Sequence, residues 1–123
     1  MSLHKIRLVL ARNADFPEGS ALHGYEFTAP LKSDGSLDGQ EWQSVRPSCR
    51  VHRFWLGEDD EYGQLVRHRG HHWAFHYDDM DEQDEEPIFR FDRHRFVPGE
   101  YVSITEHDEV QRTFVVTEVV PVY

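Results

Sequence analysis

Apolar residues alternate with polar ones over many short stretches of this chain, and turn residues separate the stretches. The first stretch runs from His4 to Arg12, where Ile6, Leu8 and Leu10 share one face. A period of two over this length is typical of a half-buried β-strand. Similar patterns predict further strands over these ranges: Gly24–Leu31, Cys49–Leu56, Gln64–His68, His71–Tyr77, Ile88–Phe91, Tyr101–Glu106 and Val110–Val120. We expect Arg95–Val97 to extend the strand that begins at Ile88.

Short strands joined by Gly and Pro turns indicate a mainly β fold, either a small antiparallel β-barrel or a strongly curved sheet with one short α-helix. Closure into a barrel would hide strand edges that a chain rich in Val and Phe should not expose. The length of 123 residues corresponds to one domain, so residues 1–123 are predicted to form a single unit. Three Trp, five Tyr and eight Phe argue against disorder.

The short helix is predicted from its caps. Asp38 is followed three residues later by Glu41, which is the pattern of a capping box. Leu37 precedes the cap and Trp42 occupies the fourth helical position, the spacing of a hydrophobic staple. Pro47 ends the run. We therefore predict a helix over Gly39–Arg46.

Charge narrows the classes of function. The formal net charge of −10 argues against direct nucleic-acid binding, because phosphate contacts need a cationic face. Cys49 is the single cysteine, and the N-terminal apolar stretch, interrupted by Arg7, is too short for a signal peptide or a membrane span. We expect a reduced, cytoplasmic protein that does not enter membranes, of undetermined oligomeric state.

Seven acidic residues fall within nine positions, and without them the chain would carry a net charge of −3. They form an acidic tract, predicted to be a mobile loop over residues 78–86: Asp78, Asp79, Asp81, Glu82, Asp84, Glu85 and Glu86. The tract is also a candidate docking element for a basic protein partner. Two alternatives stay open, a carboxylate site for calcium or magnesium and mimicry of a phosphate backbone.

A His-rich hairpin is the strongest candidate for metal chemistry. Arg69-Gly70 between two alternating runs predicts a two-residue loop that places His68 opposite His71. His76 and Asp78 would share one face about 7 Å apart. Imidazole and carboxylate ligands suit a divalent metal, so the candidate ligands are His68, His71, His76 and Asp78. The alternative is that these are outward-facing polar residues.

Two Arg-rich segments form a third candidate. Arg50, Arg53, Arg93 and Arg95 would make an anion pocket if the segments met, because guanidinium groups hold carboxylate or phosphate bidentately. The alternative is that they pair with acidic residues on the surface. Cys49, next to Arg50, is interpreted as a structural residue.

Four stretches of the chain resemble an uncharacterised family of small bacterial proteins: Gly24-Tyr25-Glu26-Phe27, Arg53-Phe54-Trp55, Trp73-Ala74-Phe75-His76-Tyr77 and Phe96-Val97-Pro98-Gly99-Glu100-Tyr101-Val102-Ser103. The similarity extends along most of the chain. It implies a bacterial cytoplasmic setting, and it implies no activity, cofactor or site residue.

Motifs of the common enzyme classes are absent from the sequence, including phosphate-cradling loops, nucleophile elbows and zinc-binding helices. Ser20, His23 and Asp15 form only a loose trio. We therefore predict a non-enzymatic β-barrel module that binds a protein or a small ligand. The alternatives are a metal-binding protein or metal-dependent enzyme that uses the His-rich hairpin, and an acidic nucleic-acid mimic.

Overall fold

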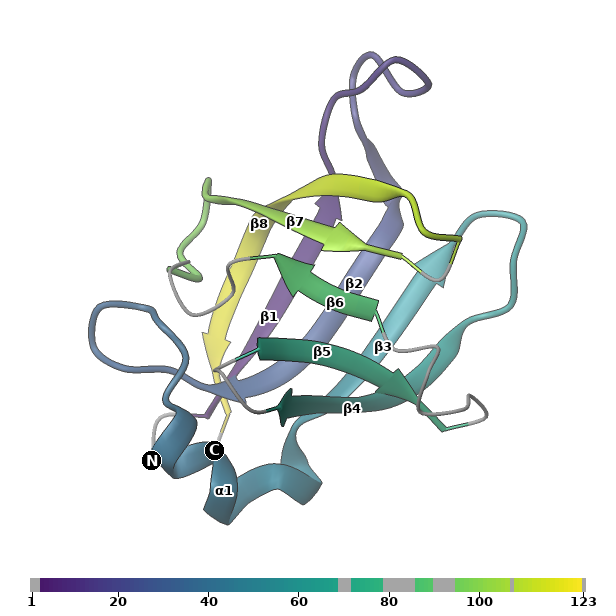
Figure 1. Cartoon of the computed structure of the whole chain (residues 1–123). Helices are drawn as coiled ribbons and strands as arrows, with labels where there is room; N and C mark the ends of the chain where they lie inside the picture. The colour runs from purple at the N-terminus through teal and green to yellow at the C-terminus, as the bar shows by residue number, and fades with distance from the viewer. Residues whose placement is uncertain (1–2, 69–71, 79–85, 90–94, 107, 123) are drawn as a thin grey trace.

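The structure, a computed structural model, describes residues 3–68, 72–78, 86–89, 95–106 and 108–122. Within these ranges the chain forms eight strands: β1 (Leu3–Leu10), β2 (Ser20–Pro30), β3 (Arg50–Trp55), β4 (Glu61–His68), β5 (His72–Tyr77), β6 (Glu86–Phe89), β7 (Tyr101–Thr105) and β8 (Gln111–Pro121). Each strand pairs antiparallel with the next, and β8 pairs with β1, so the sheet closes into a barrel (Figure 1). The predicted mainly β class, with a small antiparallel barrel and a short helix, is confirmed.

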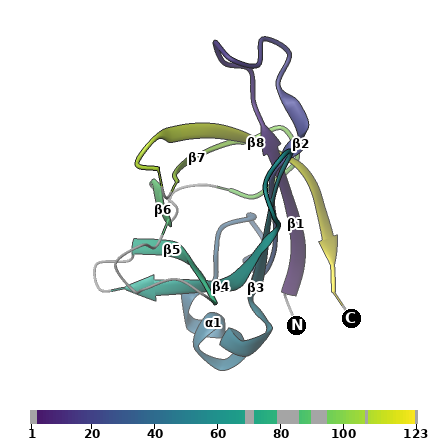
Figure 2. The same cartoon turned by 90° about the vertical axis from the view of Figure 1, so that its right-hand side faces the viewer.

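The two ends of the barrel carry different features. The upper end in Figure 1 bears the β1–β2 loop (residues 11–19) and the turns that join β3 to β4 and β7 to β8. The lower end bears the two chain termini and helix α1 (Gly39–Val45). Figure 2, turned by 90°, shows the β1–β2 loop standing clear of the upper end and α1 beneath the lower end.

Side chains fill the barrel interior in the alternation that the sequence predicts. Ile6, Leu8 and Leu10 of β1 are buried, as are the inward residues of the other long strands. Aromatic rings form the centre of the core, where Tyr25 and Phe27 lie 5.1 and 5.3 Å from the ring of Phe75. Eight strands enclose a space about wide enough for packed side chains.

Phe96 completes this core from a segment that is not a strand. The predicted strand extension over Arg95–Val97 is therefore wrong. The backbone N–H of Phe96 donates to the carbonyl of Gly35 in the turn after β2, at 2.7 Å, instead of joining a strand ladder. That bond places the fully buried Phe96 ring 5.7 Å from Phe27.

Helix α1 closes the lower end of the barrel. The Asp38 carboxylate accepts the N–H of Glu41 at 3.0 Å, which confirms the predicted N-cap. Leu37 and Trp42 are both buried in the core, as the staple pattern requires. The α-helix ends at Val45, one residue before the predicted limit, and continues as a 3₁₀ turn over Arg46–Ser48. Pro47 lies in that turn because it cannot extend an α-helical ladder.

The register of the His-rich hairpin differs from the prediction by one residue. His68 pairs with His72, and Leu65 pairs with Phe75. The predicted two-residue loop would have set Leu65 opposite Ala74. A one-residue slip moves a whole strand face from the core to solvent, and only the observed register sets the buried Leu65 and Phe75 opposite each other on the inward face.

A buried ionic cluster lies at the upper end of the interior. Glu106 and Arg53 are only 2% and 3% exposed. One carboxylate oxygen of Glu106 accepts from the Tyr25 hydroxyl at 2.6 Å and from Arg53 Nε at 3.1 Å. The other oxygen accepts from Arg112 Nη1 at 2.7 Å. Arg53 also contacts Glu58 at 3.1 Å, so the charges are compensated within the protein.

We expect Glu106→Gln to lower the free energy of unfolding by about 3 kcal/mol, because a buried Arg53 loses its nearest counter-charge. Urea denaturation of the two proteins measures the difference. Glu100→Gln, at an exposed turn position, is the matched control and should change the value by less than about 0.5 kcal/mol. Equal, small effects of both substitutions would contradict a stabilising role for the cluster.

Candidate functional site

Three of the predicted metal ligands, His68, His76 and Asp78, lie within the described residues, where their backbone positions are spread along the hairpin. His68 pairs with His72, which lies four residues before His76 on β5, so His68 and His76 are about 13 Å apart along the sheet. His71 lies outside the described residues. No group of three His, Cys, Asp or Glu side chains able to hold a metal occurs in the described ranges. Metal binding by the hairpin stays a prediction.

Asp78, the fourth predicted ligand, already has a cationic partner. Its two carboxylate oxygens accept from Arg50 at 3.2 and 2.7 Å. This bidentate hydrogen bonding holds the pKa of Asp78 below its usual value. Asp78 is also the first residue of the acidic tract, and Glu86 at its other end begins β6. The five acids between them, Asp79, Asp81, Glu82, Asp84 and Glu85, lie outside the described residues, so the docking role of the tract is untested.

The predicted anion-binding arginines Arg50 and Arg53 do not lie together. Arg50 and Arg53 are three residues apart on β3 and therefore point to opposite faces of the sheet. Arg50 pairs with Asp78 outside the barrel, whereas Arg53 lies inside it with Glu106. Arg95 is exposed beside the turn after β2, and Arg93 lies outside the described residues. The alternation that buries Val51 also points Arg53 inward, so the burial of Arg53 could have been predicted from the sequence.

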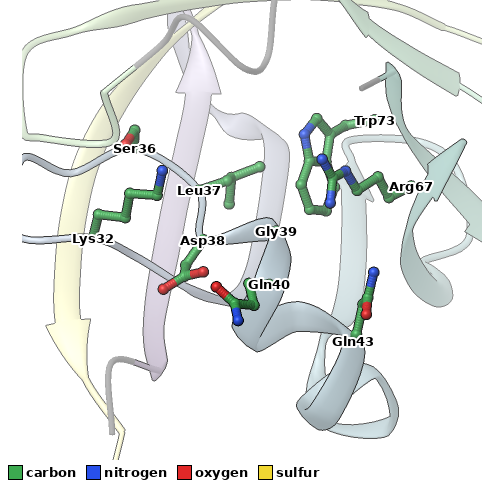
Figure 3. Close-up of a pocket in the computed structure, with 9 residues that line it drawn as sticks. All are labelled: Lys32, Ser36, Leu37, Asp38, Gly39, Gln40, Gln43, Arg67 and Trp73. Carbon is green, nitrogen blue, oxygen red and sulfur yellow. The ribbon is translucent and has the colours of Figure 1, made fainter. Parts of the chain in front are cut away.

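A different pair of cations lines a cavity at the lower end, between the start of α1 and the end of β4 (Figure 3). The cavity has a volume of about 530 Å³, within the usual range for small-ligand sites. Most of its lining is polar. The residues that line it are Lys32, Ser36, Leu37, Asp38, Gly39, Gln40, Gln43, Arg67 and Trp73. We call it the α1 cavity.

The Arg67 guanidinium packs against Gly39, which has no side chain. A Cβ atom on Gly39 would lie 2.4 Å from Arg67 Nη1 and 2.7 Å from its Cζ, so glycine makes room for the guanidinium. On its other side the guanidinium carbon lies 5.5 Å from the centre of the Trp73 ring, a cation–π distance. Figure 3 shows the Arg67 side chain running along Trp73. The guanidinium is therefore confined between an aromatic ring and the helix backbone.

In Figure 3, Lys32 and Arg67 lie on opposite sides of Leu37. Lys32 begins a tight turn in which its backbone N donates to the carbonyl of Ser36 at 2.8 Å and Gly35 N donates to the carbonyl of Lys32 at 2.9 Å. The Asp34 carboxylate fixes the same turn by accepting from Ser36 N and Oγ. Lys32 therefore extends from a rigid base.

The charge of the α1 cavity is opposite in sign to that of the chain. Among the described residues of its lining, two cations and the Asp38 carboxylate give a formal charge of +1, against −10 for the whole sequence. The Asp38 carboxylate accepts the helix N-cap bond, which fixes its orientation. The cavity thus offers guanidinium, ammonium and amide donors, an arrangement suited to an oxyanion.

Lys32 and Arg67 were not among the predicted site residues, because they are 35 positions apart and no local spacing links them. Comparisons with protein-family models, with curated proteins and with solved structures each give no match. The resemblance to uncharacterised bacterial proteins accordingly stays a prediction. In the described part of the chain, no helix has the length and apolar character needed to span a bilayer.

Cys49 is fully buried, which raises the pKa of its thiol to about 11. We expect the folded protein to resist alkylation by iodoacetamide at about pH 8, because the reactive thiolate is scarce and inaccessible. The urea-unfolded chain should react completely under the same conditions, as mass spectrometry would show. Labelling of the folded protein at the rate of the unfolded chain would contradict the structural role assigned to this residue.

Proposed function

We propose that the protein is a non-enzymatic β-barrel module that binds one small ligand carrying a phosphate or carboxylate group in the α1 cavity. The observation that carries the proposal is the confinement of the Arg67 guanidinium between Gly39 and Trp73, on the opposite side of Leu37 from Lys32 (Figure 3). A cation held in place loses little conformational freedom when it pairs with an anion, which favours binding.

The functional groups of the cavity favour binding over catalysis. The residues that line it in the described structure include no His or Cys. Its hydroxyl, on Ser36, donates to Asp34, and its carboxylate, on Asp38, caps α1. General acid–base chemistry requires a group with a proton to exchange near neutral pH. The lining supplies hydrogen-bond donors and positive charge instead.

The ligand affinity should be modest. Charge-assisted hydrogen bonds to an oxyanion contribute roughly 1.5–3 kcal/mol each, and ordering the exposed Lys32 side chain opposes them. We expect dissociation constants between about 10 µM and 1 mM. The affinity should fall as salt rises, because the cavity opens to solvent.

The proposed setting is the bacterial cytoplasm, in keeping with the single buried thiol. A basic protein partner for the acidic tract remains compatible with this function, because the α1 cavity does not include Asp78.

Isothermal titration calorimetry with inorganic phosphate, citrate and ribose 5-phosphate at low salt tests the proposal. We expect at least one of the three anions to bind with a stoichiometry of one. The double substitution Lys32→Gln with Arg67→Gln should weaken that binding at least tenfold, or about 1.4 kcal/mol. Lys5→Gln, which removes an exposed cation paired with Glu26, is the control and should leave the affinity within about twofold. No binding of any anion, or equal affinity for the double variant, would contradict the site.

Gly39→Ala provides a second, subtler test. Its methyl group would occupy the space of the Arg67 guanidinium, and the flexible arginine can move away at little cost in stability. Alanine is also the better helix former, although at the first helical position the gain is smaller than the value of about 1 kcal/mol in a helix interior. We therefore expect lower anion affinity in a protein that is at least as stable as the parent, measured by calorimetry and urea denaturation. Unchanged affinity would show that the confined guanidinium is not needed.

A further inference from the structure

The β1–β2 loop, which protrudes from the upper end (Figures 1 and 2), is organised from within. The side-chain oxygen of Asn13 accepts from the backbone N–H groups of Asp15 and Phe16, both at 2.8 Å. The carbonyl of Phe16 accepts from Asn13 N at 3.0 Å and from Gly19 N at 2.9 Å. These bonds make the loop a compact unit, which Phe16 attaches to the core.

His23 is the residue on which that attachment rests. Its side chain is on the inward face of β2 and the residue is only 4% exposed. The centre of the Phe16 ring lies 4.7 Å from the centre of the imidazole. The centre of the Trp55 ring lies 4.4 Å from it, in an edge-to-face arrangement. The imidazole therefore links the loop to β3.

Ser20 is the hydrogen-bond partner of the His23 ring. Ser20 Oγ accepts from the backbone N–H of Leu22 at 3.2 Å and lies 2.6 Å from His23 Nδ1. In the neutral tautomer with its proton on Nε2, Nδ1 accepts from the Ser20 hydroxyl, whereas in the imidazolium Nδ1 donates to Ser20 Oγ.

Charged groups from four parts of the chain lie around the His23–Trp55 pair. Arg53 of β3 lies 4.6 Å from the Trp55 ring centre, and Arg112 of β8 lies 5.4 Å from it. Glu106, after β7, and Glu58, in the β3–β4 turn, supply the opposing charges. Burial and the Arg53 cation lower the pKa of His23, and the two glutamates only partly offset them. An imidazolium here would lie near a buried cation.

We propose that His23 is an acid-sensitive latch that holds the β1–β2 loop on the barrel end while it is neutral and releases the loop when it is protonated. Protonation reverses the hydrogen bond with Ser20 and adds a cation beside Arg53. Residues of the loop also line a second cavity of about 680 Å³, together with Tyr101 and Val115. Release of the loop would therefore open that cavity.

The direction of the pH dependence follows from the lowered pKa. A neutral His23 binds fewer protons in the latched state than in the released state, where its pKa returns towards about 6.5. The latch is thus fully closed when the pH is above the ordinary pKa of histidine. It weakens as the pH falls from there through the lowered pKa of the latched state.

Hydrogen exchange of the loop amides tests the latch. In the wild type, protection of the Asn13 and Gly19 amides, corrected for intrinsic exchange, should fall at least roughly threefold between about pH 7.5 and pH 5, whereas the amides of Ile6 and Val116 should keep theirs. His23→Gln retains an acceptor for Ser20 and cannot titrate, so its loop protection should not change with pH. His52→Gln, which removes an outer-face histidine paired with Asp60, should leave the wild-type response intact.

Two results would overturn the proposal: constant loop protection in the wild type, or the same acid loss in His23→Gln. If His23→Gln does not fold, NMR titration of the wild-type His23 ring provides the test. The loop amide shifts should then follow the His23 titration with a midpoint below about 6.5. A midpoint at or above that value, or loop shifts that do not follow His23, would refute the latch.

Discussion

Strand β1 is hydrogen-bonded along both edges, and this closure is the constraint on which the rest of the molecule depends. Val9 pairs with Gly24 of β2 on one side and with Val115 of β8 on the other. Irregularities in the register fall beside this point in both ladders, and a Cβ on Gly24 would lie 2.0 Å from the carbonyl oxygen of Leu8. Glycine therefore permits the close approach that a strongly curved barrel requires. Once the sheet is closed, every second residue must occupy the interior.

The two ends of the barrel meet that requirement by different means. At the lower end, Trp42 of α1 and Trp73 of β5 pack edge to face at 5.6 Å and complete the apolar core. At the upper end, Arg53 on β3 and Glu106 after β7 point into the barrel. Because water is excluded there, the two side chains must satisfy each other. At the lower end, the polar groups lie outside the apolar core and line the α1 cavity. At the upper end, the charged groups lie inside the barrel, so this end is sensitive to the charge on His23.

Local patterns predicted the fold well, but they could not predict the α1 cavity, for a physical reason. The alternation of Ile6, Leu8 and Leu10 and the cap at Asp38 depend on neighbours in sequence, so the strands and the helix followed from them. The predicted register of the His-rich hairpin was wrong by one residue. The prediction gave more weight to the turn pattern Arg69-Gly70 than to the pairing of Leu65 with Phe75 in the core. The α1 cavity joins Lys32, Gly39 and Arg67 through closure of the barrel, and no spacing in a single sequence reports such a contact. Arg53 and Glu106, in contrast, were predictable as buried charges from the period of two.

The central claim is that the confined Arg67 guanidinium and Lys32, at the lower end of the barrel, bind an oxyanion. NMR titration with inorganic phosphate at low salt tests where binding occurs. The account predicts saturable shifts of the Trp73 indole N–H, of the Gln40 and Gln43 side-chain amides and of Arg67 Nε–H, all with one dissociation constant. Saturable shifts centred instead on Arg7 and Arg50 of the outer face, or shifts that never saturate, would contradict it.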